Sequence, residues 1–223
     1  TLKTRSCYYY LRENHRYDVY LDYLSGKITR DELYNHLPES EHAKIINSAI
    51  STENNEQIFS QINNSLSGRE VDLIIGGPPC QAYSVVGRSR SADGMQNDAR
   101  NYLYLEYVKY LNYYRPKMFV FENVLGLQSA QNGKYLTDMQ QKFRKSGYEI
   151  EVFRLNARAF GVLQNRVRLI IVGCHIDVGA NIPDLKQINF MTDKKFLVAD
   201  LFTDLPALQN GEGSFKRCNY AKK

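Results

Sequence analysis

Three short stretches of the sequence carry residue types that can do chemistry. In LIIGGPPCQAYS, residues 73–84, Cys80 follows two prolines at the end of an apolar run. Proline fixes its own backbone angle and donates no hydrogen bond, so Pro78 and Pro79 hold the cysteine in one attitude. A free thiol is only slightly ionised at neutral pH, and a nearby helix N-terminus would favour the reactive thiolate. The pattern predicts a cysteine that meets a substrate, and its alternative is a buried structural thiol.

A carboxylic acid and two arginines accompany this cysteine. Glu122 lies near the end of the run KMFVFENV, and Arg166 and Arg168 are the first and third residues of the run RVRLIIVG. A protonated glutamate can give a proton to an electron-poor ring nitrogen, and arginine can hold a keto oxygen or a phosphate through its forked donors. The alternatives are a glutamate that caps a loop and arginines that form solvent-facing salt bridges.

The first 70 residues are predicted to be mostly helical. Thr29 and Glu32 form a capping-box pattern at one helix start, and Ile58, Ile62 and Leu66 follow at helical spacing. The tyrosine run at residues 8–10 admits two interpretations, base stacking and amphipathic packing, and we favour packing.

From residue 71 the pattern changes to alternating strands and helices. The run VDLIIGG predicts a strand buried on both faces. A helix through residues 103–111 should end at Arg115-Pro116, and a second through 136–143 should close at Gly147. The runs KMFVFENV, YEIEVFRL and RVRLIIVG predict three more strands. This order predicts an α/β sheet with ligands at the carboxyl ends of its strands. An antiparallel last strand would bring its arginines to the edge where Glu122 and Cys80 lie.

Composition restricts the class of protein without identifying it. The 223-residue chain is 43% hydrophobic and 24% charged, with a net charge of +5 and a pI near 8.9. This mildly basic balance suits a polyanionic partner. The four cysteines have no CxxC spacing, which argues against a zinc site and a disulfide framework. No secretory leader or membrane-spanning run is recognised, so we expect a cytoplasmic protein.

The motifs resemble the cytosine-5 DNA methyltransferases of bacterial restriction–modification systems. GGPPCQAYS, FVFENVLGL and FGVLQNRVRLIIVG look like three of the family's signature motifs in the family's order, and NDARNYLYLEYV looks like a fourth. The resemblance covers residues 71–173. It implies a Rossmann-like S-adenosylmethionine-dependent methyltransferase sheet flanked by helices.

The resemblance also implies roles for individual residues. Cys80 would add to carbon 6 of a flipped-out cytosine, Glu122 would bind ring nitrogen 3 and the exocyclic amine, and Arg168 would sit at the 2-keto oxygen. Arg166 would support the same cleft or the DNA backbone. The methyl group would come from S-adenosylmethionine, contacted by Pro79, Leu103 and Ile50, although Leu103 fits a core position equally well.

The partner implied by the resemblance is double-stranded DNA in a bacterial cell, at the nucleoid. The DNA contacts are assigned to Gln81 and Ser84 and to three arginines of the following polar loop, Arg88, Arg90 and Arg100. A cognate restriction endonuclease could belong to the same system, and the oligomeric state stays open.

The chain departs from the family pattern at both ends. The glycine-rich strand that receives the cofactor is lacking, and Ala49 stands where an acidic residue is usual. We expect residues 1–190 to be an N-terminally incomplete catalytic domain and residues 191–223 a truncated lead-in to a target recognition region. Without its first strand the sheet would have an open groove or edge at its middle. The alternatives to a DNA methyltransferase are a non-catalytic nucleic-acid-binding fragment or scaffold and an RNA cytosine-5 methyltransferase.

Overall fold

The structure is a computed structural model that describes residues 2–79, 102–187, 198–203 and 205. Its α-helices are α1 (Leu2–Glu13), α2 (Tyr17–Leu24), α3 (Arg30–Asn35), α4 (Glu39–His42), α5 (Asn55–Leu66), α7 (Leu103–Tyr114), α8 (Lys134–Lys145) and α9 (Val198–Phe202). Its strands are β1 (Leu73–Gly76), β2 (Met118–Asn123), β3 (Tyr148–Asn156) and β4 (Val167–His175). The predicted change from helices to alternating strands and helices near residue 71 is confirmed.

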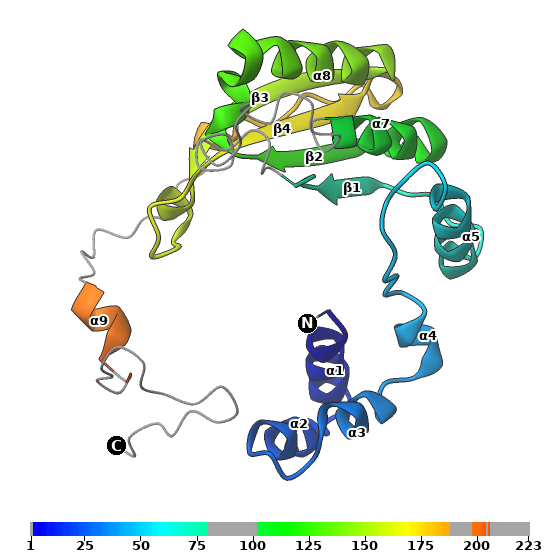
Figure 1. The fold of residues 1–223 in the computed structure, drawn as a ribbon, viewed down its shortest axis with the longest axis vertical. Coiled ribbons are helices and arrows are strands. Elements are labelled where there is room, and N and C mark those ends of the chain that lie inside the picture. Colours follow the sequence, from blue (N-terminus) through cyan, green and yellow to red (C-terminus); the bar gives the residue numbers. More distant parts are fainter. Residues whose placement is uncertain (1, 80–101, 188–197, 204, 206–223) are drawn as a thin grey trace, which may run out of the picture.

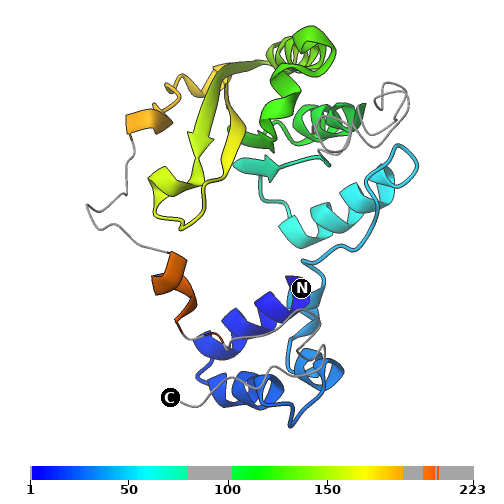
Figure 2. The ribbon, with the colours of Figure 1, turned by 60° about the vertical axis from the view of Figure 1, so that its left-hand side comes forward.

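The helices α1, α2 and α3 form a group with a hydrophobic core of their own. Figures 1 and 2 show this group lying away from the sheet. Its buried side chains are Cys7, Leu11, Val19, Leu33 and Leu37. The predicted capping box is confirmed at the start of α3: the Glu32 backbone N–H donates to Thr29 Oγ1, and the Glu32 carboxylate accepts from the Thr29 backbone N–H. These bonds hold the pKa of Glu32 below its usual range.

The four described strands form one mixed sheet in the order β1-β2-β4-β3. The strands β1 and β2 are parallel, with Gly76 opposite Phe121. The strand β4 runs antiparallel to both of its neighbours, with Ile170 opposite Glu122 on β2. The sheet therefore has the antiparallel last strand that would bring the arginines to the carboxyl ends of β1 and β2.

One face of the sheet is covered by α7 and α8, which lie side by side over it in Figures 1 and 2. Phe119 and Phe121 of β2 and Leu169 and Ile171 of β4 point into this core. Gly173 of β4 lies opposite Phe119, and a Cβ at this glycine would meet the phenyl ring at 2.0 Å. The face is packed so closely that β4 has room for no side chain at that position.

Both helices over the sheet end where the sequence predicts. The helix α7 stops at Arg115, which adopts a left-handed conformation (φ 44°) before Pro116. The helix α8 is followed by Gly147 at φ 91°, whose N–H donates to the Arg144 carbonyl. A left-handed residue closes a helix by satisfying its last carbonyl groups.

The strand β1 differs from its prediction, because it is not buried on both faces. The side chain of Leu73 is 47% exposed and that of Ile75 is 70% exposed. In the described part of the chain β1 pairs with β2 alone, so its second edge has no partner strand there, and the face that carries these two side chains is partly exposed. The sheet is therefore open at β1, which is an outer strand of the described four and does not lie at the middle of that sheet. No helix of the described residues is long and apolar enough to span a membrane.

Candidate active site

Glu122 and Arg168 form an ion pair at the carboxyl edge of β2. The register of β2 and β4 brings the end of one strand beside the start of the other, and Arg168 Nε lies 2.8 Å from Glu122 Oε1. The arginine also donates through Nη1 to the Val167 carbonyl at 2.9 Å, which restricts its orientation. The side chains of Glu122 and Arg168 remain 42% and 23% exposed, so a polar ligand can reach both.

The turn after β1 starts against the same glutamate. A Cβ placed on Gly77 would lie 2.9 Å from Glu122 Oε2 and 3.1 Å from the Glu122 carbonyl oxygen. Only glycine therefore allows the backbone to approach this carboxylate so closely. The described chain continues through Pro78 and the exposed Pro79 toward Cys80, which lies outside the described residues.

The two cysteines that the structure describes are poor candidates for a nucleophile. Cys7 and Cys174 are both buried. Burial raises the pKa of the Cys7 thiol, and the Cys7 sulfur donates to the Leu33 carbonyl. A nucleophilic thiol must be ionised and accessible, which argues against both residues.

Arg166 directly precedes β4 and takes no part in the Glu122–Arg168 ion pair. Its side chain is exposed, and among the described residues no contact joins it to Glu122. Its backbone N–H donates to Asn156 Oδ1 at 3.1 Å, and its carbonyl accepts from the Ala157 N–H at 2.9 Å. The structure thus fixes the backbone of Arg166 and leaves its guanidinium group facing solvent.

Two asparagines missed in the sequence support this edge. Asn156 also donates to Asn165 Oδ1 at 2.6 Å, so it ties together both ends of the loop that carries the arginines. Asn123 is 1% exposed and its Oδ1 accepts from the Val124 N–H, while its Nδ2 has no partner among the described residues. Asparagines at strand ends are a recognisable signal for such local bonds.

Two of the three residues expected to contact the cofactor lie on neighbouring segments. Thr52 donates to Glu106 Oε1 at 3.2 Å and Asn55 donates to Oε2 at 2.6 Å, which ties the segment after Ile50 to the first turns of α7. The side chain of Ile50 is 53% exposed, and Leu103 is partly buried at the start of α7. The structure thus connects the segments that carry Ile50 and Leu103.

The Glu106 carboxylate, which joins α7 to the segment after Ile50, is held in its charged form. Burial raises the pKa of Glu106, but hydrogen bonds from Lys109, Asn55 and Thr52 outweigh burial and hold that pKa below its ordinary value. Lys109 Nζ lies 2.9 Å from Glu106 Oε1 and also donates to Thr52. The carboxylate therefore acts as the centre of the contact between α7 and the segment that leads into α5.

The residues expected to touch DNA are not tested by the geometry. Gln81, Ser84, Arg88, Arg90 and Arg100 all lie outside the described residues. No cluster of potential metal ligands occurs in the part of the chain that the structure describes. What that part offers is a carboxylate and a guanidinium 2.8 Å apart, beside a glycine turn that leads to a cysteine.

The described fold is an α/β sheet flanked by helices, with a carboxylate and a guanidinium paired at one edge, and comparison with known proteins gives its family. The model of the C-5 cytosine-specific DNA methylase family matches residues 37–223. The chain belongs to this family.

Individual relatives support the same family. The chain is 32% identical over 241 aligned positions to Type II methyltransferase M.Bpa9945I of Bacillus paralicheniformis, covering 96% of this chain and 54% of the relative. It is 31% identical to Type II methyltransferase M1.HphI of Haemophilus parahaemolyticus, covering 77% and 43%. The chain thus spans about half the length of these relatives.

A solved structure supports the fold. A crystal structure described as a prophage-encoded DNA modification methyltransferase from E. coli matches with a TM-score of 0.55 and 25% identity, over 72% of this chain and 42% of that one.

Proposed function

We propose that the protein is a DNA (cytosine-5-)-methyltransferase that transfers a methyl group from S-adenosylmethionine to carbon 5 of a cytosine in duplex DNA. The observation that carries the proposal is the Glu122–Arg168 pair, held beside the glycine turn that leads to Cys80. A neighbouring carboxyl group and guanidinium can hold the adjacent ring nitrogen and keto oxygen of one base.

The chemistry of the chain's own residues begins at Cys80. Its thiolate adds to carbon 6 of the cytosine and forms a carbon–sulfur bond, while the electron pair of the 5,6 double bond makes carbon 5 nucleophilic. Glu122 holds ring nitrogen 3 and the exocyclic amine and supplies the proton that nitrogen 3 takes up. Arg168 holds the 2-keto oxygen.

The same residues reverse the addition after methyl transfer. S-Adenosylmethionine, when bound, supplies the methyl group that carbon 5 accepts. Loss of the carbon-5 proton to a base then restores the double bond, and the carbon–sulfur bond breaks to free the Cys80 thiolate. In this proposal Ile50 and Leu103 hold the adenine of the cofactor, and Pro79 contacts it beside the cysteine.

The DNA must be distorted for this reaction. A cytosine inside a duplex is inaccessible, so it is flipped out at a cost of a few kcal/mol. In the proposal Gln81 and Ser84 fill or line the space left by the base, and Arg88, Arg90, Arg100 and Arg166 contact phosphates. Residues 1–190 then supply the catalytic domain and residues 191–223 lead into target recognition. We place the protein at the bacterial nucleoid, in a system with a cognate restriction endonuclease.

Covalent trapping tests the proposal. The chain, and a form extended at both ends because its relatives are about twice as long, are mixed with S-adenosylmethionine and duplex DNA that carries 5-fluorocytosine. Fluorine blocks the final elimination, so we expect a protein–DNA adduct by mass spectrometry. The adduct should be absent in Cys80→Ser and strongly reduced in Glu122→Gln.

The outcomes separate the candidate functions. An adduct with the extended form alone keeps the proposal and shows that residues beyond this chain complete the cofactor site. No adduct with either form, on DNA of mixed sequence that the protein binds, overturns it in favour of a binding scaffold. Trapping on fluorinated tRNA and not on DNA overturns the choice of DNA.

A further inference from the structure

The helices α1–α3 carry a surface feature that the proposed reaction does not use. All three helices end before residue 37, where the match to the methylase family begins. They enclose a hydrophobic core that shares no residue with the core of the sheet. Their exposed side chains can therefore serve a purpose separate from the catalytic edge.

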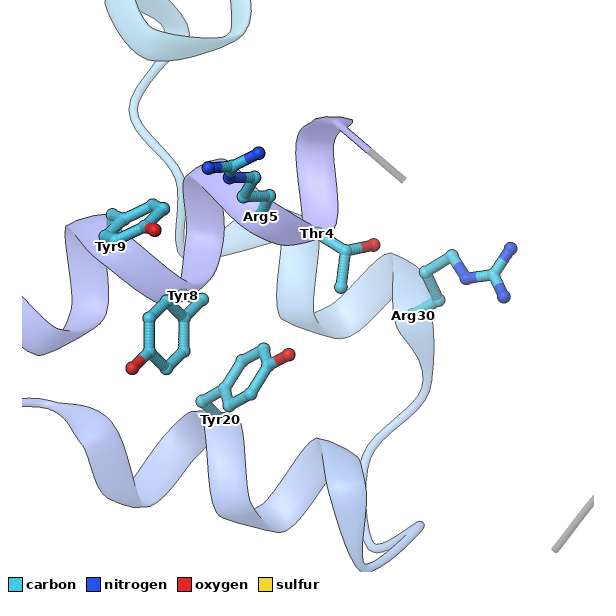
Figure 3. A pocket seen from close by; sticks show the side chains of 6 residues that line it. All are labelled: Thr4, Arg5, Tyr8, Tyr9, Tyr20 and Arg30. Carbon is cyan, nitrogen blue, oxygen red and sulfur yellow. The ribbon is translucent and has the colours of Figure 1, made fainter. Parts of the chain in front are cut away.

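An open cavity of about 560 Å³ lies on this group of helices. Figure 3 shows the six side chains that line it: Thr4, Arg5, Tyr8, Tyr9, Tyr20 and Arg30. Arg5 comes from α1 and Arg30 from the start of α3, so two arginines that are 25 positions apart in sequence (30 − 5) line one cavity. The volume falls in the range of sites for small organic ligands.

The charge of the cavity favours an anion. No carboxylate lines it, and in the described part of the chain neither Arg5 nor Arg30 forms an ion pair. The Arg30 side chain shares a hydrogen bond with Tyr23, and Asp31 adds a favourable charge beside it. Two guanidinium groups on one cavity, neither of them in an ion pair among the described residues, are suited to phosphate.

The aromatic side chains make the cavity suited to a flat ring as well. Tyr8 packs edge-on against Tyr9 and Tyr20, each with 5.1 Å between ring centroids. Tyr9 is 39% exposed, and the guanidinium groups of Arg5 and Arg12 lie 5.6 and 5.2 Å from its ring centre. Stacked arginine and tyrosine side chains lose little freedom when they bind a base.

We propose that this cavity, the α1–α3 pocket, binds one nucleotide unit of a nucleic acid, with Arg5 and Arg30 on the phosphates at either side of the unit and the tyrosines against its base or sugar. Stacking on tyrosine is tolerant of sequence, so the pocket would add affinity without selecting a target. The flanking DNA of a methylation substrate would supply such a unit. The inference does not depend on the proposed methyl transfer, because it concerns binding alone.

Fluorescence anisotropy tests the pocket with labelled single-stranded and duplex oligonucleotides of mixed sequence. The 223-residue chain is compared with Arg5→Ala/Arg30→Ala. We expect the double variant to bind about tenfold more weakly, and the slope of log affinity against log salt to fall by about one unit for each arginine. The matched control is Arg16→Ala, which removes an exposed arginine at the N-cap of α2 that does not line the pocket.

A second pair of variants tests stacking. Tyr9→Ala should weaken binding, and Tyr9→Phe, which keeps the ring, should not. Circular dichroism checks that each variant keeps its helices, and the trapping reaction at Cys80 is measured separately so that the two proposals can fail independently.

The results distinguish the source of the nucleotide. If unlabelled oligonucleotide displaces the labelled one and a hundredfold excess of dCMP does not, the pocket binds a nucleic acid polymer, as proposed. If dCMP competes as well as the oligonucleotide at equal phosphate concentration, the pocket binds a free nucleotide and the proposal of a polymer is wrong. The inference is overturned if the double variant binds like Arg16→Ala, or if polyglutamate displaces the oligonucleotide as well as unlabelled DNA does.

Discussion

Replacing Gly77 by alanine should slow the reaction without unfolding the protein. The added Cβ would lie 2.9 Å from Glu122 Oε2, whereas ordinary contacts of this kind begin at 3.4 Å, so the carboxylate or the turn must move by 0.5 Å (3.4 − 2.9) to restore an ordinary contact. Glu122 Oε1 is held 2.8 Å from Arg168, so a moving carboxylate disturbs the ion pair. Catalytic groups tolerate displacements of only about 0.5 Å.

The expected size of the effect follows from that displacement. A misplacement of about 1 Å can cost a hundredfold in rate, so we expect adduct formation in the extended enzyme to slow by about ten- to a hundredfold. This corresponds to roughly 1.4–2.7 kcal/mol in the barrier. Gly77 is exposed, so the free energy of unfolding should change by less than about 0.5 kcal/mol.

The control for this substitution is Gly68→Ala. Gly68 adopts φ +81° and a Cβ there would meet nothing within 4 Å, so alanine should cost about 1 kcal/mol of stability and leave the rate unchanged. Rates of adduct formation are measured in single turnovers with 5-fluorocytosine DNA, and stability by urea unfolding. A Gly77→Ala enzyme that reacts at the rate of the parent would refute the role given to this close approach.

Three further outcomes are expected. Arg168→Ala should lower stability by less than about 1 kcal/mol, because its pair with Glu122 is partly exposed, yet slow adduct formation at least about tenfold; a normal rate would make the pair structural. Gly173→Ala should destabilise by about 3 kcal/mol in urea unfolding because its Cβ enters the Phe119 ring, and an unchanged midpoint would contradict the packing. The pKa of Glu106 is lowered in the folded protein, so the stability that its carboxylate contributes is present above its unfolded pKa and is lost as pH falls through its folded pKa. Glu106→Gln should therefore make the free energy of unfolding fall less steeply below about pH 4.3. An unchanged pH dependence of stability in this acidic range would contradict the role given to Glu106.

Local signals in the sequence predicted much of the fold. Thr29, Arg115 and Gly147 act through bonds and backbone angles within a few residues, so the helix boundaries they mark could be recognised without tertiary information. The strands were recognised from apolar runs. The burial of β1 was predicted wrongly, because the exposure of Leu73 and Ile75 depends on which neighbours a strand has.

The candidate site was predicted in its residue types and only partly in its geometry. The motifs named Glu122 and Arg168, and the order of strands allowed them to meet. Asn156 was missed, because its bonds to both ends of one loop become visible only when β3 and β4 pair. The approach of Gly77 to Glu122 was also invisible, since it joins strands whose separation depends on the whole sheet.

The sequence by itself determined the chemical groups, the helices and strands, and the family. Tertiary structure alone decided that β4 runs antiparallel, that Arg168 meets Glu122 at 2.8 Å, and that Arg5 and Arg30 share a cavity with three tyrosines. The physical reason is the range of the forces involved. Hydrogen bonds within a turn act between neighbours in the chain, whereas ion pairs and shared cavities require segments that only the packed core brings together.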